Sequence, residues 1–133
     1  MDLGVKRTKN SDELLYSRTK IINACKACKV DAIDTPFTDT NDYEGLMADT
    51  LKAKMLGFTG KLSINPRQID TIHKGYAPSE AEITHAQRVM AAKEEAAKQG
   101  LGVFSLDGKM VDLPIINRAI HTLDMAKLMG LID

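Results

Sequence analysis

The chain of 133 residues has no excess of charge of either sign and no long hydrophobic run. Eighteen basic side chains balance eighteen acidic ones, so the sequence lacks the net field that attracts nucleic acid or an anionic membrane. The one basic cluster, Lys6, Arg7 and Lys9, is predicted to be solvated surface. No apolar stretch is long enough to cross a bilayer or to form a signal peptide. We therefore expect no nucleic-acid partner, no membrane span and a cytoplasmic location.

Cysteine and histidine are also scarce. The two cysteines, Cys25 and Cys28, form an isolated C-x-x-C pair, and the three histidines are too scattered to complete a zinc site. A redox pair is expected at the start of a helix, whereas this pair lies at the end of a helical pattern. The cysteines are therefore predicted to fill one face of a helix, and no residue of the chain is assigned as a metal ligand.

Helical and extended patterns alternate in the first half of the chain. Helices are expected over residues 11–29, over residues 42–56 and from residue 67, with strands over residues 30–37 and 61–64. This order favours parallel strands joined by helical crossovers. The strands end in proline corners, Thr35-Pro36 and Asn65-Pro66. Since ligands of parallel α/β folds lie beyond the carboxyl ends of the strands, the corners indicate a binding site; alternatively, the prolines only terminate the strands.

The last part of the chain predicts a helix, a β-hairpin and a second helix. The first of these helices, over residues 79–99, opens with Ser79 and Glu82 in the spacing of a capping box. Asp107-Gly108 is a strong hairpin signal, and Asp112 is placed to cap the final helix. We therefore divide the chain into an α/β part, residues 1–75, and a helix–hairpin–helix extension, residues 76–133.

Four motifs resemble one known family in their order and spacing. They are VDAIDTPFTDTND at residues 30–42, LGFTGKLSINPRQID at 56–70, YAPSEAEITHAQRV at 76–89 and GKMVDLPIINRA at 108–119. They are similar to the carboxyl-terminal part of the citrate lyase beta subunit family, which includes malyl-CoA lyases and related carbon–carbon lyases acting on coenzyme A thioesters. Many relatives have His-Pro where this chain has Asn65-Pro66, and the Asn form is similar to the citrate lyase branch.

The resemblance implies a fold, a reaction and a set of site residues. The fold is the carboxyl-terminal part of a (β/α)₈ barrel with an extension, and the reaction is a retro-Claisen cleavage of a citryl thioester to oxaloacetate and an acetyl thioester. A magnesium ion would polarise the keto acid oxygen. Asp112 would act as the acid or base at the barrel of a neighbouring subunit, or would only cap its helix. The thioester would be bound by the two corners, at Thr35, Pro36, Phe37, Ile64, Asn65 and Pro66.

The resemblance also implies that part of the enzyme is missing from this stretch. A full barrel needs about 250 residues, and the family's metal-binding residues lie in a segment before residue 1; Asp2 is not assigned as a ligand. We therefore expect no lyase activity from these residues alone, and self-association into a homo-oligomer because half a barrel leaves apolar surface bare. The expected partners are the citrate lyase alpha and acyl carrier subunits and the citryl or acetyl thioester. The alternatives are a malyl-CoA-type lyase and a non-catalytic interaction module.

Overall fold

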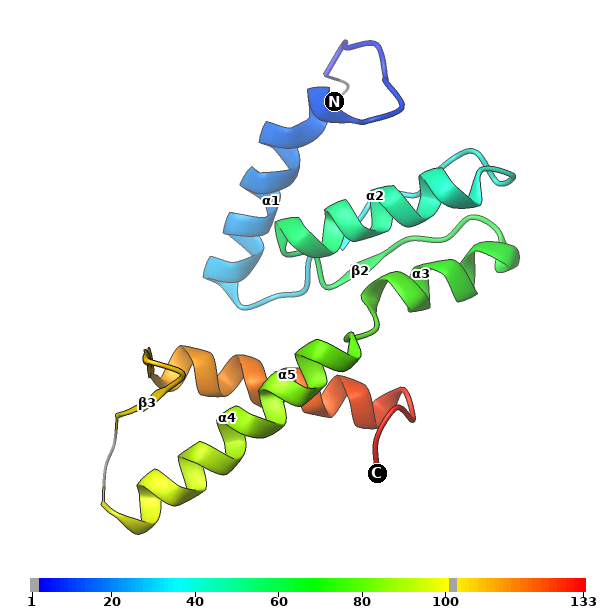
Figure 1. The fold of residues 1–133 in the computed structure, drawn as a ribbon. Helices are drawn as coiled ribbons and strands as arrows, with labels where there is room; N and C mark the ends of the chain where they lie inside the picture. Colours follow the sequence, from blue (N-terminus) through cyan, green and yellow to red (C-terminus); the bar gives the residue numbers. More distant parts are fainter. Residues whose placement is uncertain (1–2, 101–102) are drawn as a thin grey trace. The chain divides into compact units, whose positions relative to one another are not determined.

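The computed structural model describes residues 3–100 and 103–133, which form a helix-rich α/β structure (Figure 1). The chain divides into two compact units, Met1–Tyr76 and Ala77–Asp133. The first unit contains, in order, the 3₁₀ helix η1 (Asp12–Leu14), α1 (Leu15–Cys28), β1 (Ile33–Asp34), α2 (Tyr43–Leu56), β2 (Gly60–Lys61), the 3₁₀ helix η2 (Pro66–Gln68) and α3 (Ile69–Tyr76). The second unit contains α4 (Glu80–Lys98), β3 (Phe104–Leu106), β4 (Lys109–Val111) and α5 (Leu113–Leu128). In the part of the chain that the structure describes, no helix is long and apolar enough to span a membrane.

The two strands of the first unit are parallel neighbours, which confirms the prediction from the alternation of helices and strands. Ile33 pairs with Gly60 and Asp34 pairs with Lys61, and α2 makes the crossover between the strands. The strands are shorter than predicted because a strand is defined by pairing, and each has one neighbour among the described residues. The carboxyl ends of β1 and β2 therefore lie side by side.

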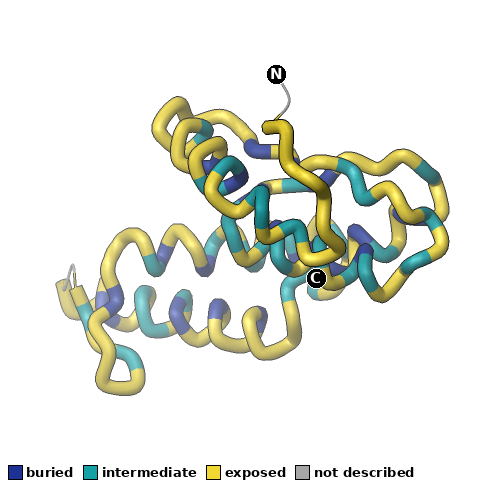
Figure 2. The backbone as a smooth tube through the Cα atoms, turned by 90° about the horizontal axis from the view of Figure 1, so that it is seen from above, coloured by how far each residue is buried: buried dark blue, intermediate teal, exposed yellow. Residues whose placement is uncertain are grey.

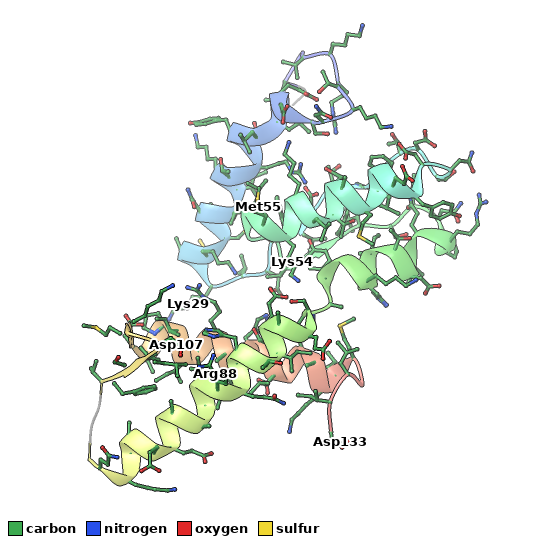
Figure 3. All side chains as sticks on the ribbon, in the orientation of Figure 1. Lys29, Lys54, Met55, Arg88, Asp107 and Asp133 are labelled. Atoms are coloured by element: carbon green, nitrogen blue, oxygen red, sulfur yellow. The ribbon has the colours of Figure 1, made fainter. Side chains whose placement is uncertain are left out.

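Helix α2 lies between α1 and α3 in the first unit (Figure 1). Its buried side chains are Leu46, Thr50 and Ala53, which share one face because they are four and three residues apart. Met55 is 75% exposed and points away from this face (Figure 3). A Cβ atom at Gly75 of α3 would come within 2.6 Å of Thr50 Cγ2, so the close approach of α2 and α3 requires glycine at this position.

The two cysteines lie in the last turn and a half of α1 as free thiols. Cys25 is half-buried and packs against the core formed by Ile22, Ala32, Ala53 and Phe58. Cys28 is exposed and is the last residue of α1, since the chain leaves the helix at Lys29 with φ at 56°. The prediction that both cysteines fill one face of the helix is therefore correct only for Cys25.

The β1–β2 pair has one polar buried face and one apolar exposed face. Neighbouring residues of a strand point to opposite sides of the sheet, so Asp34, 2% exposed, and Ile33, 50% exposed, face in opposite directions. Leu62 and Ile64, which follow β2, are each 54% exposed. Apolar side chains are thus left open beside a buried set of charges, which is the reverse of a usual small α/β core.

The second unit is held together by one apolar core between α4, the hairpin and α5. Its buried members are Ala86, Val89, Val111, Ile116 and Ala119, and Figure 2 shows such buried positions recurring along the helices. The capping box at the start of α4 is present: the Ser79 hydroxyl accepts from the Glu82 backbone N–H at 3.2 Å, and the Ser79 backbone N–H donates to the Glu82 carboxylate at 2.7 Å.

Strands β3 and β4 are antiparallel and joined by a tight turn. Asp107 and Gly108 both have positive φ angles, 52° and 74°, as a two-residue hairpin turn requires. The Arg88 guanidinium of α4 donates to the Asp107 carboxylate at 2.7 Å (Figure 3), and this hydrogen bond holds the pKa of Asp107 below its usual range. The ion pair fastens the hairpin tip to α4.

Candidate functional site

The two proline corners lie together at one edge of the β1–β2 pair. Thr35 follows β1 directly, and the chain after β2 runs on beside it, because the Leu62 backbone N–H donates to the Asp34 carbonyl at 3.0 Å. A cavity of about 430 Å³ opens at this edge. Its lining includes four residues of the predicted thioester site: Thr35, Pro36, Phe37 and Ile64. The structure therefore brings residues of both corners to one cavity.

Asn65 and Pro66 do not line that cavity in the described structure, and their local role is the start of η2. The Asn65 side-chain oxygen accepts from the Arg67 backbone N–H at 3.0 Å, and Pro66 occupies the first helical position. This pairing of an Asn cap with a following Pro is a favourable helix start. The corner therefore has a structural reason for its sequence besides any contact with a ligand.

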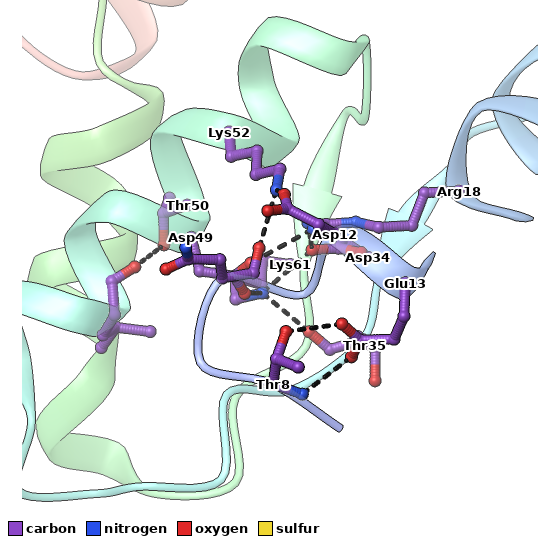
Figure 4. Close-up of polar contacts among 12 residues, drawn as sticks. Thr8, Asp12, Glu13, Arg18, Asp34, Thr35, Asp49, Thr50, Lys52 and Lys61 are labelled. Atoms are coloured by element: carbon purple, nitrogen blue, oxygen red, sulfur yellow. Dashed lines mark hydrogen bonds and ion pairs between the residues drawn. The ribbon is translucent and has the colours of Figure 1, made fainter. Parts of the chain in front are cut away.

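A buried cluster of four charged side chains lies next to this edge of the β1–β2 pair (Figure 4). We call Arg18, Asp34, Asp49 and Lys61 the charge cluster. The Arg18 guanidinium donates to Asp34 at 2.6 Å and to Asp49 at 3.2 Å. The Lys61 ammonium contacts the same two carboxylates, with 2.9 Å to Asp34. The cluster joins α1, β1, α2 and β2, and its two positive and two negative charges cancel.

The side chains of the charge cluster are almost completely removed from water, which costs desolvation free energy. The Lys61 side chain is 0% exposed, that of Asp34 2% and that of Arg18 5%. Charges removed from water this far are tolerated only when each is paired and hydrogen-bonded. The Arg18 guanidinium also lies over the Phe58 ring, with its Cζ atom 5.7 Å from the ring centroid. Burial, followed by the negative charge of Asp34, raises the pKa of Tyr76 to about 12, so the Tyr76 hydroxyl is a neutral neighbour of the cluster.

The charge cluster does not suit a divalent cation. Mg²⁺ prefers carboxylate oxygens that are free to coordinate it, whereas Asp34 and Asp49 are each already bonded to Arg18 and Lys61. A cation placed there would also meet two positive side chains. Among the described residues no group of three or more His, Cys, Asp or Glu side chains could hold a metal. The residues that the structure describes therefore do not fit a magnesium site.

Two buried side chains hold the first corner by its backbone carbonyls. The Lys61 ammonium donates to the Thr35 carbonyl at 2.8 Å, and the Gln68 side-chain amide donates to the Phe37 carbonyl at 2.9 Å. Neither Lys61 nor Gln68 was predicted as a site residue from the sequence. For Lys61 the sequence offers no positional signal, because Asp34 directly precedes the Thr35-Pro36 corner whereas Lys61 lies four residues before Asn65. For Gln68 no local signal indicates its bond to the Phe37 carbonyl, since Phe37 lies 31 residues away.

The basic residues near the N-terminus are paired at the cavity rim. Arg7 lies 3.5 Å from the Glu13 carboxylate and Lys9 lies 2.8 Å from the Asp42 carboxylate. The hydrogen bond to Lys9 lowers the pKa of Asp42. Arg7 and Lys9 are nevertheless largely exposed, in agreement with the predicted solvated surface.

Asp112, the predicted acid or base, belongs to the second unit and is exposed. Its carboxylate accepts from the Ile115 backbone N–H at 3.3 Å, which makes it the N-cap of α5. The neighbouring side chains Met110 and Leu113 are 69% and 67% exposed. Asp112 is thus a helix cap within an open apolar surface, and one of its carboxylate oxygens has no partner among the described residues.

Known proteins resemble the chain over nearly its whole length. Residues 1–66 match the family described as HpcH/HpaI aldolase/citrate lyase. The chain is 45% identical over 130 residues to the citrate lyase subunit beta of Escherichia coli strain K12, covering 98% of this chain and 43% of that protein. It is 34% identical over 124 residues to the mitochondrial citramalyl-CoA lyase of Homo sapiens, covering 93% of this chain and 36% of that protein.

The fold is also similar to that of a solved structure of a related protein. The fold is similar to that of CitE from Mycobacterium tuberculosis in complex with magnesium, acetoacetate and coenzyme A, with a TM-score of 0.77 and 31% identity, covering 93% of this chain and 46% of that one. The chain thus spans less than half the length of the relatives it matches. On the match of its first half and the identity throughout, the chain belongs to the HpcH/HpaI aldolase/citrate lyase family.

Proposed function

We propose that this chain is the carboxyl-terminal part of a citrate lyase beta subunit and supplies the thioester end of its active site. The observation that carries the proposal is the cavity lined by Thr35, Pro36, Phe37 and Ile64. These residues come from the carboxyl ends of two adjacent parallel strands, where α/β barrels bind their substrates. The relatives' names favour citrate lyase, because the citramalyl-CoA lyases are the less similar group.

The reaction would be the cleavage of a citryl thioester. As the carbon–carbon bond breaks, its electron pair passes to the acetyl thioester as an enolate, and the carbinol hydroxyl gives its proton to a general base and becomes the keto group of oxaloacetate. The enolate carbon then takes up a proton. The protein must therefore hold the thioester in one orientation and supply an acid near that carbon. The corners would provide the first of these functions.

Asp112 would provide the second. Its exposed carboxylate and the apolar side chains beside it, Met110 and Leu113, suit contact with another protein surface. We assign Asp112 to the barrel mouth of a neighbouring subunit, in addition to its role as a helix cap. The magnesium ion of the family would belong to the part of the relatives that this chain does not match, because the residues described here do not fit it.

The open face of the β1–β2 pair supports completion of a (β/α)₈ barrel. Ile33 and Leu62 are about half exposed, and such side chains are buried in the interior of a complete barrel. The remaining strands of the barrel would cover them. The assembly would be a cytoplasmic homo-oligomer working with the citrate lyase alpha and acyl carrier subunits.

Titration of the ¹⁵N-labelled chain with acetyl-CoA tests the site assignment. We expect the largest amide shifts at Thr35, Phe37 and Ile64, with free coenzyme A giving smaller shifts there because it lacks the acetyl carbonyl. The amides of α4 serve as the internal control. Largest shifts outside the two corners, or none at all, would contradict the assignment of the thioester site.

A further inference from the structure

Gln68 is almost completely buried, with 1% of its surface exposed, although it lies in a short surface helix. A buried amide is costly unless its donor and acceptor are both satisfied. In Gln68 both are: the amide nitrogen donates to the Phe37 carbonyl at 2.9 Å, and the amide oxygen accepts from the Ile64 backbone N–H at 3.2 Å. The side chain therefore spans the two corners.

These two bonds fix the distance between the segments that line the cavity. Phe37 belongs to the corner after β1 and Ile64 to the corner after β2. The β1–β2 ladder and the bond from the Leu62 N–H join the two strands up to the corners. The corner after β1 is then held by two side chains: Lys61 of β2 donates to the Thr35 carbonyl, and Gln68 of η2 donates to the Phe37 carbonyl. Lys61 acts at the base of the corner, whereas Gln68 acts at its tip. Both contacts are made to residues that line the cavity.

The hydrogen bonds made by Lys61 and Gln68 also determine which backbone groups of the corners remain for a ligand. The carbonyls of Thr35 and Phe37 are used by Lys61 and Gln68, and the Ile64 N–H is used by Gln68. The Ile64 N–H has one hydrogen, so a substrate could use it only by breaking its bond to Gln68, whereas each of the two carbonyls keeps a second lone pair. The bonds made by Lys61 and Gln68 therefore give the corners a fixed shape and leave one carbonyl lone pair at Thr35 and one at Phe37.

We propose that Gln68 is a positioning residue that braces the two corners and so sets the width of the acetyl-thioester subsite. This inference rests on the proposed function. It predicts that loss of the Gln68 amide widens the cavity at Phe37 and Ile64 and weakens binding of the acetyl thioester, while binding of the parts of coenzyme A remote from the corners is retained.

The test compares Gln68→Met, which keeps the length of the side chain but removes both bonds, with Gln87→Met, a matched change at an exposed position of α4. In Gln68→Met we expect the Ile64 amide to exchange with solvent at least about tenfold faster, and acetyl-CoA to bind about tenfold more weakly. Affinity for free coenzyme A should change less than twofold or so. Gln87→Met should match the wild type in all three measurements.

A second variant, Gln68→Glu, keeps an oxygen for the Ile64 N–H but has no donor for the Phe37 carbonyl. It should retain slow exchange at Ile64 and still lose affinity for acetyl-CoA, which a merely destabilised fold would not produce. Unchanged exchange at Ile64 in Gln68→Met, or an equal loss of affinity for acetyl-CoA and coenzyme A, would overturn the inference. If the wild type itself fails to bind acetyl-CoA, the proposed function fails, and exchange at Ile64 alone decides whether Gln68 braces the corners.

Discussion

Replacing Lys61 with Met should destabilise the first unit by about 3–5 kcal/mol, because it removes one partner from a buried set of ion pairs. The Lys61 ammonium is fully buried against Asp34 and Asp49. Methionine fills a similar volume, so the loss comes from two carboxylates left to share Arg18, and from the Thr35 carbonyl left without its donor. Urea unfolding followed by tyrosine fluorescence measures the effect, since all three tyrosines lie in residues 1–76 and the chain has no tryptophan.

Two further variants make that result specific. Lys74→Met changes an exposed lysine of α3 and should alter the free energy of unfolding by less than about 0.5 kcal/mol. The double variant Lys61→Met with Asp49→Asn leaves the Arg18–Asp34 pair intact and balances the charges again. It should therefore be more stable than Lys61→Met alone. A Lys61→Met variant as stable as the wild type would show that the charge cluster contributes nothing to the fold.

Replacing Asp112 with Asn should abolish most of the cleavage activity and leave the stability of the second unit almost unchanged. Asparagine caps helices about as well as aspartate, so the bond from the Ile115 N–H is kept. The amide cannot transfer a proton, and the loss of an acid or base typically lowers the rate by about 10²–10⁴-fold. The assay is the cleavage of citryl-CoA by this chain combined with the rest of the barrel, alongside thermal unfolding of the chain.

The same helix provides the matched control. Asp124→Asn changes an exposed aspartate of α5 and should leave both the cleavage rate and the unfolding midpoint as they are. Asp112→Ala should lose both the activity and about 1 kcal/mol of stability, because alanine cannot cap the helix. Full activity in Asp112→Asn, together with lost stability in Asp112→Ala, would show that Asp112 is a helix cap and nothing more.

The sequence predicts the order of the elements because that order is encoded locally. Periodicity gives the helices, and the capping box of Ser79 and Glu82 gives the start of α4 to the residue. The parallel arrangement of β1 and β2 follows from the intervening helix. The strand lengths do not follow, because they depend on how many neighbours a strand has, and no window of the sequence contains that information.

The interior of the site is less accessible to sequence analysis. Residues 61–64 have the pattern of an apolar strand, yet Lys61 is the most deeply buried side chain among them. Its burial depends on Asp34, Asp49 and Arg18, which lie on three other elements. The role of Gln68 depends in the same way on the carbonyl of Phe37. Such contacts join distant segments through tertiary structure, whereas the proline corners could be located because each is a local break in the chain.

Mixing this chain with the part of the Escherichia coli citrate lyase subunit beta that it does not match, and measuring cleavage of citryl-CoA in the presence of Mg²⁺, tests the assignment most directly. If these residues form the thioester end of a barrel whose metal ligands lie in the other part, neither piece alone will cleave the thioester and the mixture will. Cleavage by the 133-residue chain alone, or a mixture no more active than its separate pieces, would contradict it.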